Sequence, residues 1–513
     1  MEILMINKKY LYFVWSRDDM RLFALIFFFS IIAKGAAAFR GVSIDDYPFS
    51  LGVSDKQLEL FLTQGRFLGW LTAYVIDAIG VNLNDTYFAS ALLVIALQAA
   101  LVVSVMRFVG YSSLISAGII GGLISLYPYS AELLTFKVIL PIYALALVFT
   151  IIAIESAREG SKGFGVKVVA MLSIAAALMT YQASLNYLLV AAYGCLLMSV
   201  IFKRKDTESE LEYHAMRSRG WWLLLFSFLG AALFLATLSL VKHLGLVGDV
   251  TARAKFIGIN QLSKRVEEVS SALYTIFLKS EPIFPIGLKA VFMIITLTAI
   301  LLVLANLLRG FRNYWNLVFG LFLLSLIPLL SIGIIIPFND WWPVPRVLAH
   351  VSLLFGLLFL AAEKTISQGA CNLIGRFFMV GGSLILLGFV FINNQVFADQ
   401  QKIAQWDRFK VNRIVGRLEG MPDFKDIERL YVNGGGWGYP IGLRTLQGDM
   451  NISAFSAEWS KVPLVLESTG YNFGRPSATD IKIGTELCAE RSPWPDKDSV
   501  FVRGELAVVC LER

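Results

Sequence analysis

The chain has 513 residues, of which 57% are hydrophobic and only 16% are charged, and its mean hydropathy is +0.66. Soluble proteins carry about a quarter charged residues, so this composition excludes an ordinary soluble domain. The formal charge of +7 alone would permit nucleic-acid binding, but the basic residues stand mostly in short segments between apolar runs. That pattern is typical of membrane topology signals, and we expect no nucleic-acid partner.

Long runs of Leu, Ile, Val, Phe and Ala predict helices that cross a lipid bilayer. Lipid offers backbone groups no hydrogen bonds, so a helix of about 20 apolar residues must satisfy them internally. The fold class that we predict is a polytopic α-helical membrane protein with about eleven transmembrane helices. They are expected at residues 21–39, 86–106, 112–127, 132–154, 168–181, 185–202, 221–241, 286–308, 315–336, 346–362 and 377–397. The first resembles a signal peptide, but the helices that follow favour an uncleaved anchor.

Basic residues indicate which side of the membrane is cytoplasmic. Lys8, Lys9, Arg17 and Arg21 precede the first predicted helix, and alternate counting places the other basic loops on the same side. These loops contain Arg107, Arg158, Lys162, Lys167, Lys203, Arg204, Lys205, Arg217, Arg219, Arg309, Arg312, Lys364 and Arg376. The opposite side receives the 40–85 loop, the 242–285 loop and the chain from about 398. We therefore expect an inner-membrane protein with a cytoplasmic N-terminus.

The C-terminal part of the sequence predicts a separate unit. We expect a transmembrane domain at 1–397 and a small α/β periplasmic domain at 398–513. A polar helical stretch at 399–418 opens this domain, and strand-like runs follow at 429–432, 462–466 and 500–509, separated by turn residues. Cys488 and Cys510 are able to form a disulfide in an oxidising compartment, and the sequence leaves open whether they do.

The first outer loop begins with the pair Asp45-Asp46. Crowding two carboxylates at a membrane surface is unfavourable unless water, a cation or a substrate uses them. For an arbitrary Asp pair, a solvated helix boundary is the commoner explanation. A carboxylate at this position is also suited to take the proton of a hydroxyl that attacks a sugar.

Gln64-Gly65-Arg66 follows, before an amphipathic stretch at 68–79. An arginine at the start of an interfacial helix suits a lipid phosphate, because it combines two parallel donors with a helix N-terminus. Simple snorkelling of Arg66 to the interface explains the same position equally well.

Further polar clusters stand at the outer ends of the predicted helices. Glu132 leads into a helix that contains Lys137, and a charge inside a span is a functional hypothesis by default, although Lys137 is close enough to the interface to snorkel. Tyr181-Gln182 lies in a polar turn, for which a plain tight loop is at least as good an explanation.

The last cluster is Asp340-Trp341-Trp342, followed by Arg346. Tryptophan pairs commonly anchor an interface, but they also provide stacking surfaces for sugars. Arg346 is a second candidate phosphate ligand.

Together these motifs resemble the bacterial O-antigen-modifying membrane glucosyltransferases, a family often encoded by serotype-converting phages. The resemblance spans roughly residues 20–365, and it rests on the order and the outer placement of short motifs. They are Asp45-Asp46, Gly65-Arg66, Glu132, Phe136-Lys137, Tyr181-Gln182-Ala183 and Pro345-Arg346. Tyr47 and Phe67 depart from the family, which often has a basic residue soon after the Asp pair and a proline after Gly-Arg.

The resemblance implies a GT-C-like glycosyltransferase. Such an enzyme transfers a sugar, typically glucose, from a polyprenyl-phosphate donor to lipid-linked O-antigen of lipopolysaccharide on the periplasmic side of the bacterial inner membrane. On this model Asp45 or Asp46 is the catalytic base, and cationic side chains stabilise the leaving phosphate. The phosphate ligands are then Arg66, Lys137 and Arg346, and the substrate-binding residues are Gln64, Glu132, Tyr181, Gln182, Asp340, Trp341 and Trp342.

No cofactor is predicted. His214, His243 and His350 are scattered and give no metal-ligand spacing. Binding of a divalent cation by the Asp pair is not excluded by the sequence. The main alternative function is a transporter or flippase of a lipid-linked glycan, which would typically show repeated halves with broken helices, and the sequence shows no such repeat. A non-catalytic assembly partner in envelope synthesis also stays open.

Overall fold

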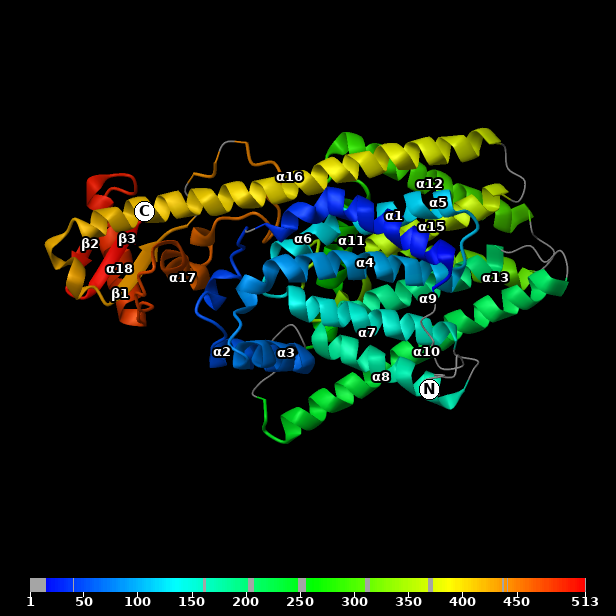
Figure 1. The fold of residues 1–513 in the computed structure, drawn as a ribbon, viewed down its shortest axis with the longest axis horizontal. Helices are drawn as coiled ribbons and strands as arrows, with labels where there is room; N and C mark the ends of the chain where they lie inside the picture. Colours follow the sequence, from blue (N-terminus) through cyan, green and yellow to red (C-terminus); the bar gives the residue numbers. More distant parts are fainter. Residues whose placement is uncertain are drawn as a thin grey trace, which may run out of the picture.

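The computed structural model describes residues 15–39, 41–159, 163–201, 207–247, 255–309, 314–367, 372–435, 438–440 and 442–512. Most of these residues are helical, and most of the helices run side by side along the long axis of the molecule (Figure 1). A small unit with a three-stranded sheet stands at one end of this bundle. Residues 8–9, 162, 203–205 and 312, used above to orient the chain, lie outside the described residues.

The helices of the bundle are α1 (Arg17–Lys34), α2 (Asp55–Thr63), α3 (Phe67–Ala78), α4 (Tyr87–Val109), α5 (Leu114–Leu126), α6 (Tyr129–Thr135), α7 (Leu140–Arg158), α8 (Phe164–Thr180), α9 (Ser184–Ile201), α10 (Thr207–His243), α11 (Leu262–Phe277), α12 (Ile286–Arg309), α13 (Tyr314–Ser325), α14 (Ile327–Ile332), α15 (Val351–Ser367) and α16 (Asn372–Glu419). Among the described residues, eight helices are long and apolar enough to cross a membrane, or up to nine if the bent pair α5–α6 is one span. The other two predicted spans coincide with α8 and α15, which have 17 residues each. The count of eleven therefore stays a prediction.

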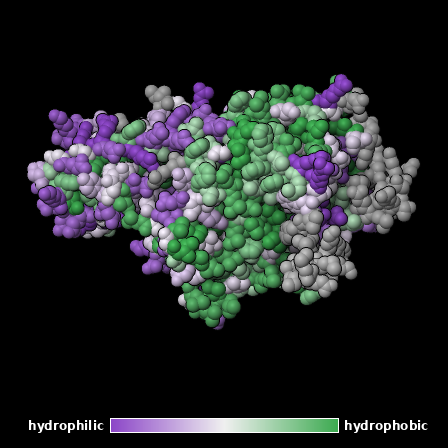
Figure 2. Space-filling model, in the orientation of Figure 1, coloured by the Kyte–Doolittle hydropathy of each residue, from purple (hydrophilic) through white to green (hydrophobic). Residues whose placement is uncertain are grey.

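The surface of the bundle supports a membrane protein. Large apolar side chains such as Phe228, Leu297 and Phe391 are exposed on α10, α12 and α16. Figure 2 shows hydrophobic residues gathered over the bundle, while hydrophilic residues cover much of the C-terminal unit. Such a surface is unfavourable in water but matches lipid chains.

Prolines account for two places where the predicted helices are broken. The predicted helix 132–154 is wrong as one element, because residues 136–139 separate α6 from α7. Pro141 stands in the first turn of α7, the position that a proline tolerates, whereas inside a continuous helix its ring would clash with the preceding turn. In the same way Pro328 stands in the first turn of α14, and the predicted helix 315–336 is divided.

The boundary predicted between residues 397 and 398 falls inside α16. This helix of 48 residues joins the last predicted span and the polar stretch 399–418 without interruption. Figure 1 shows it running from the bundle into the C-terminal unit. Because neither Pro nor Gly stands between residues 389 and 415, nothing in the sequence ends the helix at the membrane surface.

The C-terminal unit contains β1 (Arg429–Asn433), α17 (Glu458–Thr469), α18 (Ala478–Ala489), β2 (Val500–Arg503) and β3 (Leu506–Cys510). The strand order is β1-β3-β2, with β1 parallel and β2 antiparallel to the central β3. The strand predicted at 462–466 is wrong, because this run belongs to α17; a short apolar run cannot be distinguished from a buried helix by periodicity. A disulfide joins Cys488 of α18 to Cys510 of β3.

Candidate functional site

The break between α6 and α7 lies at the end of the bundle that carries the C-terminal unit, and it holds Asp46. One carboxylate oxygen of Asp46 (Oδ1) accepts a hydrogen bond from the backbone N–H of Val138 at 2.9 Å. The other (Oδ2) accepts from the backbone N–H and the hydroxyl of Ser43, at 2.8 and 2.9 Å. Asp46 is fully buried, and burial raises its pKa to about 6 although these donors favour the ionised form. Asp46 thus ties the first outer loop to the helix break.

Asp45 has a different environment from its neighbour. Its side chain is partly exposed, and its Oδ1 accepts a hydrogen bond from the indole Nε1–H of Trp459 at 3.2 Å. Trp459 belongs to α17 of the C-terminal unit. Of the two predicted catalytic carboxylates, Asp45 is therefore the one that a substrate can reach.

Lys137 was predicted to lie inside a helix. The structure places it in the break between α6 and α7. Its Nζ donates hydrogen bonds to the carbonyl oxygens of Ala37 and Leu134, at 2.8 and 2.9 Å, and its side chain is buried. The Lys137 ammonium also interacts electrostatically with Asp46. This arrangement favours a role in fixing the Asp loop.

Glu132 and Arg346 form a buried ion pair beside the break. Arg346 donates to Glu132 through its backbone N–H at 2.6 Å and through its guanidinium at 2.7 Å, and Glu132 is fully buried. A second guanidinium nitrogen donates to Asp449 of the C-terminal unit at 2.8 Å. The guanidinium carbon lies 4.5 Å from the ring centre of Phe136. Arg346 therefore connects the helix break to the C-terminal unit.

Arg66 forms the other positive group of the site. It is the N-cap residue of α3, as expected for an arginine that opens an interfacial helix, and its side chain is partly exposed. Its guanidinium carbon lies 5.6 Å from the ring centre of Tyr181, and its Nε donates to the Gln182 side chain at 3.4 Å. Gln182 in turn donates to the carbonyl oxygen of Gln64 at 2.7 Å. Tyr181 also interacts electrostatically with Arg346, so the predicted groups meet at one end of the bundle.

The predicted tryptophan pair is divided between two environments. The Arg265 guanidinium lies 4.6 Å from the ring centre of Trp341 and covers one face of the indole. Trp342 lies nearer the site, 6.0 Å from the guanidinium carbon of Arg346. Asp340 precedes the pair in the loop before α15.

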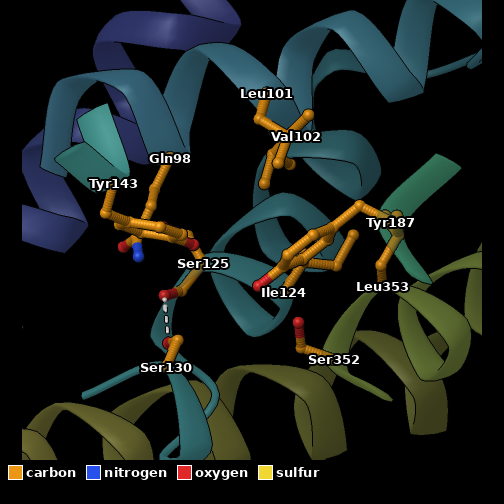
Figure 3. A pocket seen from close by; sticks show the side chains of 10 residues that line it. All are labelled: Gln98, Leu101, Val102, Ile124, Ser125, Ser130, Tyr143, Tyr187, Ser352 and Leu353. Atoms are coloured by element: carbon orange, nitrogen blue, oxygen red, sulfur yellow. Dashed lines mark hydrogen bonds between the residues drawn. The ribbon is translucent and has the colours of Figure 1, made fainter. Parts of the chain in front are cut away.

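A small cavity of about 30 Å³ lies inside the bundle next to these groups (Figure 3). It has room for one water molecule, and the hydroxyl groups of Tyr187 and Ser352 point into it. Tyr143, which also lines it, contacts Tyr181 edge to face with 5.6 Å between ring centres. The rings of Tyr143 and Tyr181 therefore lie between the cavity and the Arg66 guanidinium.

Sequence reasoning missed Lys34, which is buried at the end of α1. Its Nζ donates to the side chains of Gln98 at 3.2 Å and Ser130 at 2.7 Å, and to the carbonyl oxygen of Ser125. The signal was a lysine within the first predicted span, since intramembrane charge points to function by default. Asp449 and Trp459 were missed too, because no local pattern links them to contacts that lie 103 and 414 residues away in the sequence.

Among the residues that the structure describes, no three His, Cys, Asp or Glu side chains are grouped in a way that could hold a metal ion.

The long apolar helices among the described residues, with large apolar side chains exposed on the bundle, are typical of a membrane protein. A family model described as glucosyl transferase GtrII matches residues 41–362, so the chain belongs to the GtrII glucosyltransferase family. The predicted resemblance to O-antigen-modifying glucosyltransferases is confirmed, and the family implies a glycosyltransferase that acts in O-antigen modification. The matched region contains every predicted site residue but neither Asp449 nor Trp459. No curated protein matches the chain.

Proposed function

We propose that this glycosyltransferase transfers glucose from a polyprenyl-phosphate donor to lipid-linked O-antigen on the periplasmic side of the bacterial inner membrane. One observation carries the proposal: a partly exposed carboxylate, Asp45, and two guanidinium groups, Arg66 and Arg346, gather at one end of the bundle. An attacking hydroxyl needs a base, and a leaving phosphate needs positive charge; the site offers both.

In the proposed reaction, Asp45 takes the proton of an acceptor hydroxyl while the hydroxyl oxygen attacks the anomeric carbon of the donor sugar. The bond between this carbon and the phosphate oxygen breaks, and polyprenyl phosphate leaves with the bonding electrons. Arg66 binds the phosphate, because its side chain is partly exposed and stands at the start of α3. Arg346 is more buried and is already paired with Glu132 and Asp449, so it stabilises the charge of the leaving phosphate without binding it directly.

Asp46 and Lys137 act as positioning residues in this proposal. Both are buried and hydrogen-bonded to the chain, so neither is free to exchange its partners for a substrate. They hold the loop that presents Asp45.

The proposed periplasmic position of the site is supported by features at the end of the molecule that carries it. The C-terminal unit and helices α2 and α3 lie at the end of the bundle where the predicted outer loops fall (Figure 1). The Cys488–Cys510 disulfide suits an oxidising compartment. Exposed apolar side chains on α3, such as Leu71 and Val75, suit a helix that lies in the membrane surface, where a lipid donor arrives.

The test is sugar transfer in membranes supplied with polyprenyl-phosphate-glucose and native lipid-linked O-antigen. We expect the wild-type protein to transfer glucose and Asp45→Asn to transfer about 100-fold less or worse, because a general base contributes that much. Asp85→Asn, an exposed aspartate in the same outer loop, is the matched control and should keep full activity. Transfer by Asp45→Asn at the wild-type rate would remove Asp45 as the base. A wild type that only moves lipid-linked sugars across the bilayer would favour the flippase alternative.

A further inference from the structure

The C-terminal unit lies outside the region matched by the family model, yet it reaches the site from residues 444–460. Trp459 donates its indole N–H to Asp45 at 3.2 Å, and Asp449 accepts from Arg346 at 2.8 Å. One short segment of this unit therefore contacts both the proposed base and a proposed cation.

The unit is fixed on the first outer loop by apolar packing. Tyr47, which follows the Asp pair, is buried in one cluster with Val411, Phe455 and Leu464. Asp399 of α16 also accepts hydrogen bonds from the backbone N–H groups of Arg444 and Thr445, at 2.8 and 2.9 Å. The position of Trp459 relative to Asp45 is thus set by a packed interface.

Trp459 combines a fixed edge with an exposed ring. Its side chain stands in the first turn of α17, and 49% of the residue is exposed although its N–H is hydrogen-bonded. The exposed indole ring of Trp459 therefore offers an apolar face, and the Asp45 carboxylate lies at its edge. Ser456 lies one turn before it, and the Ser456 hydroxyl is 3.1 Å from the hydroxyl of the partly exposed Tyr439.

This surface matches the chemistry of a pyranose ring. A pyranose has a face of C–H groups, which packs on an aromatic ring, and a rim of hydroxyl groups, which bond to carboxylates and other hydroxyls. Trp341 is less suited to this role, because the Arg265 guanidinium covers one of its faces.

We propose that Trp459 forms the acceptor subsite: a pyranose of the acceptor glycan stacks on the exposed indole, and Asp45 receives the proton of its reacting hydroxyl. Ser456 and Tyr439 bind further hydroxyl groups of the same glycan. This inference rests on the proposed glucosyl transfer, and it gives the C-terminal unit the task of selecting the acceptor. Trp459 is a specificity-determining residue on this account.

The experiment measures the KM for acceptor and the KM for donor separately in the glucosyl transfer reaction. Trp459→Ala should raise the acceptor KM about tenfold, since the loss of one aromatic stacking partner is worth about one power of ten, and leave the donor KM within about twofold. Trp459→Phe keeps a stacking ring without the N–H, so its acceptor KM should stay within a few-fold of the wild type. Trp221→Ala, which removes a tryptophan of the same 49% exposure on α10, is the matched control and should change neither constant.

Limited proteolysis of each purified variant should give the wild-type cleavage pattern in the C-terminal unit, which separates a local effect from unfolding of this unit. An unchanged acceptor KM in Trp459→Ala, or an equal rise of both KM values, would overturn the subsite. If Trp459→Ala unfolds the C-terminal unit, Trp459→Phe decides, because an acceptor KM raised about tenfold in a folded Trp459→Phe variant would exclude stacking. A wild type that transfers no glucose would overturn the proposed function and this inference together.

Discussion

Replacing each member of the Asp pair by asparagine separates a catalytic carboxylate from a structural one. Asp46 accepts three hydrogen bonds, two from Ser43 and one from Val138. An asparagine there has one acceptor oxygen and one donating NH2 group. If the oxygen faces Ser43, the NH2 group faces the N–H of Val138, and one hydrogen bond is lost with a buried donor left unpaired. An unpaired buried donor costs about 1–3 kcal/mol, so at about pH 4, where Asp46 is protonated and carries no buried charge, we expect Asp46→Asn to lower the free energy of unfolding by about 2 kcal/mol.

Asp45→Asn should give the opposite result. Asp45 accepts a hydrogen bond from Trp459, which the amide oxygen of asparagine can also accept, and the residue is partly exposed. Its stability should therefore stay within about 0.5 kcal/mol of the wild type, as for most surface substitutions. Its kcat should fall by a factor of about 100 to 10,000 because the base is gone.

Thermal unfolding in detergent at about pH 4, followed by fluorescence, and glucose transfer at neutral pH and matched protein levels measure the two effects. The expected pattern is a lower Tm with residual transfer for Asp46→Asn, and a wild-type Tm without transfer for Asp45→Asn. The reverse pattern, an inactive Asp46→Asn of normal Tm beside an active Asp45→Asn, would refute the assignment of roles.

Three further results are expected. Arg66→Lys should raise the donor KM by about tenfold and leave the acceptor KM unchanged, since a lysine loses the forked donor geometry that suits a phosphate; equal donor KM values would contradict phosphate binding by Arg66. Cys510→Ser should destabilise the C-terminal unit by about 3 kcal/mol, because the bond to Cys488 closes a loop with a sequence separation of 22, and an unchanged unfolding transition would show that the disulfide adds nothing. Burial raises the pKa of Asp46 to about 6 from its ordinary 3.8, so the folded state holds this proton more tightly than the unfolded state. The free energy of unfolding of the wild type should therefore fall relative to that of Asp46→Asn as pH rises from about 4 to about 6. A constant difference between the two proteins across that range would contradict this expectation.

Hydropathy and charge located the main features of the bundle well. The Asp pair, Arg66 and Arg346 were predicted as site residues because each stands next to a long apolar run, and the structure brings them to one end of the molecule. Arg66 also opens α3 as its N-cap, which its place before an amphipathic stretch predicted. Such features depend on short-range pattern, which a single sequence carries directly.

Features that depend on distant contacts were not available from the pattern. The bond between Asp45 and Trp459 joins residues 414 positions apart, and nothing near Trp459 in the sequence marks it as part of a site. The continuous α16 was divided by hydropathy, although its helical signal continues into the polar region. The helix break at 136–139 was within reach, because Pro141 stands in the first turn of α7.

Whether the sugar comes from a lipid-linked donor is decided by transfer with the purified protein in liposomes, supplied with one donor at a time. Labelled polyprenyl-phosphate-glucose and labelled UDP-glucose would each be supplied with lipid-linked O-antigen. We expect label in the O-antigen with the polyprenyl-phosphate donor alone. Label from UDP-glucose instead, or from neither donor, would contradict the proposal.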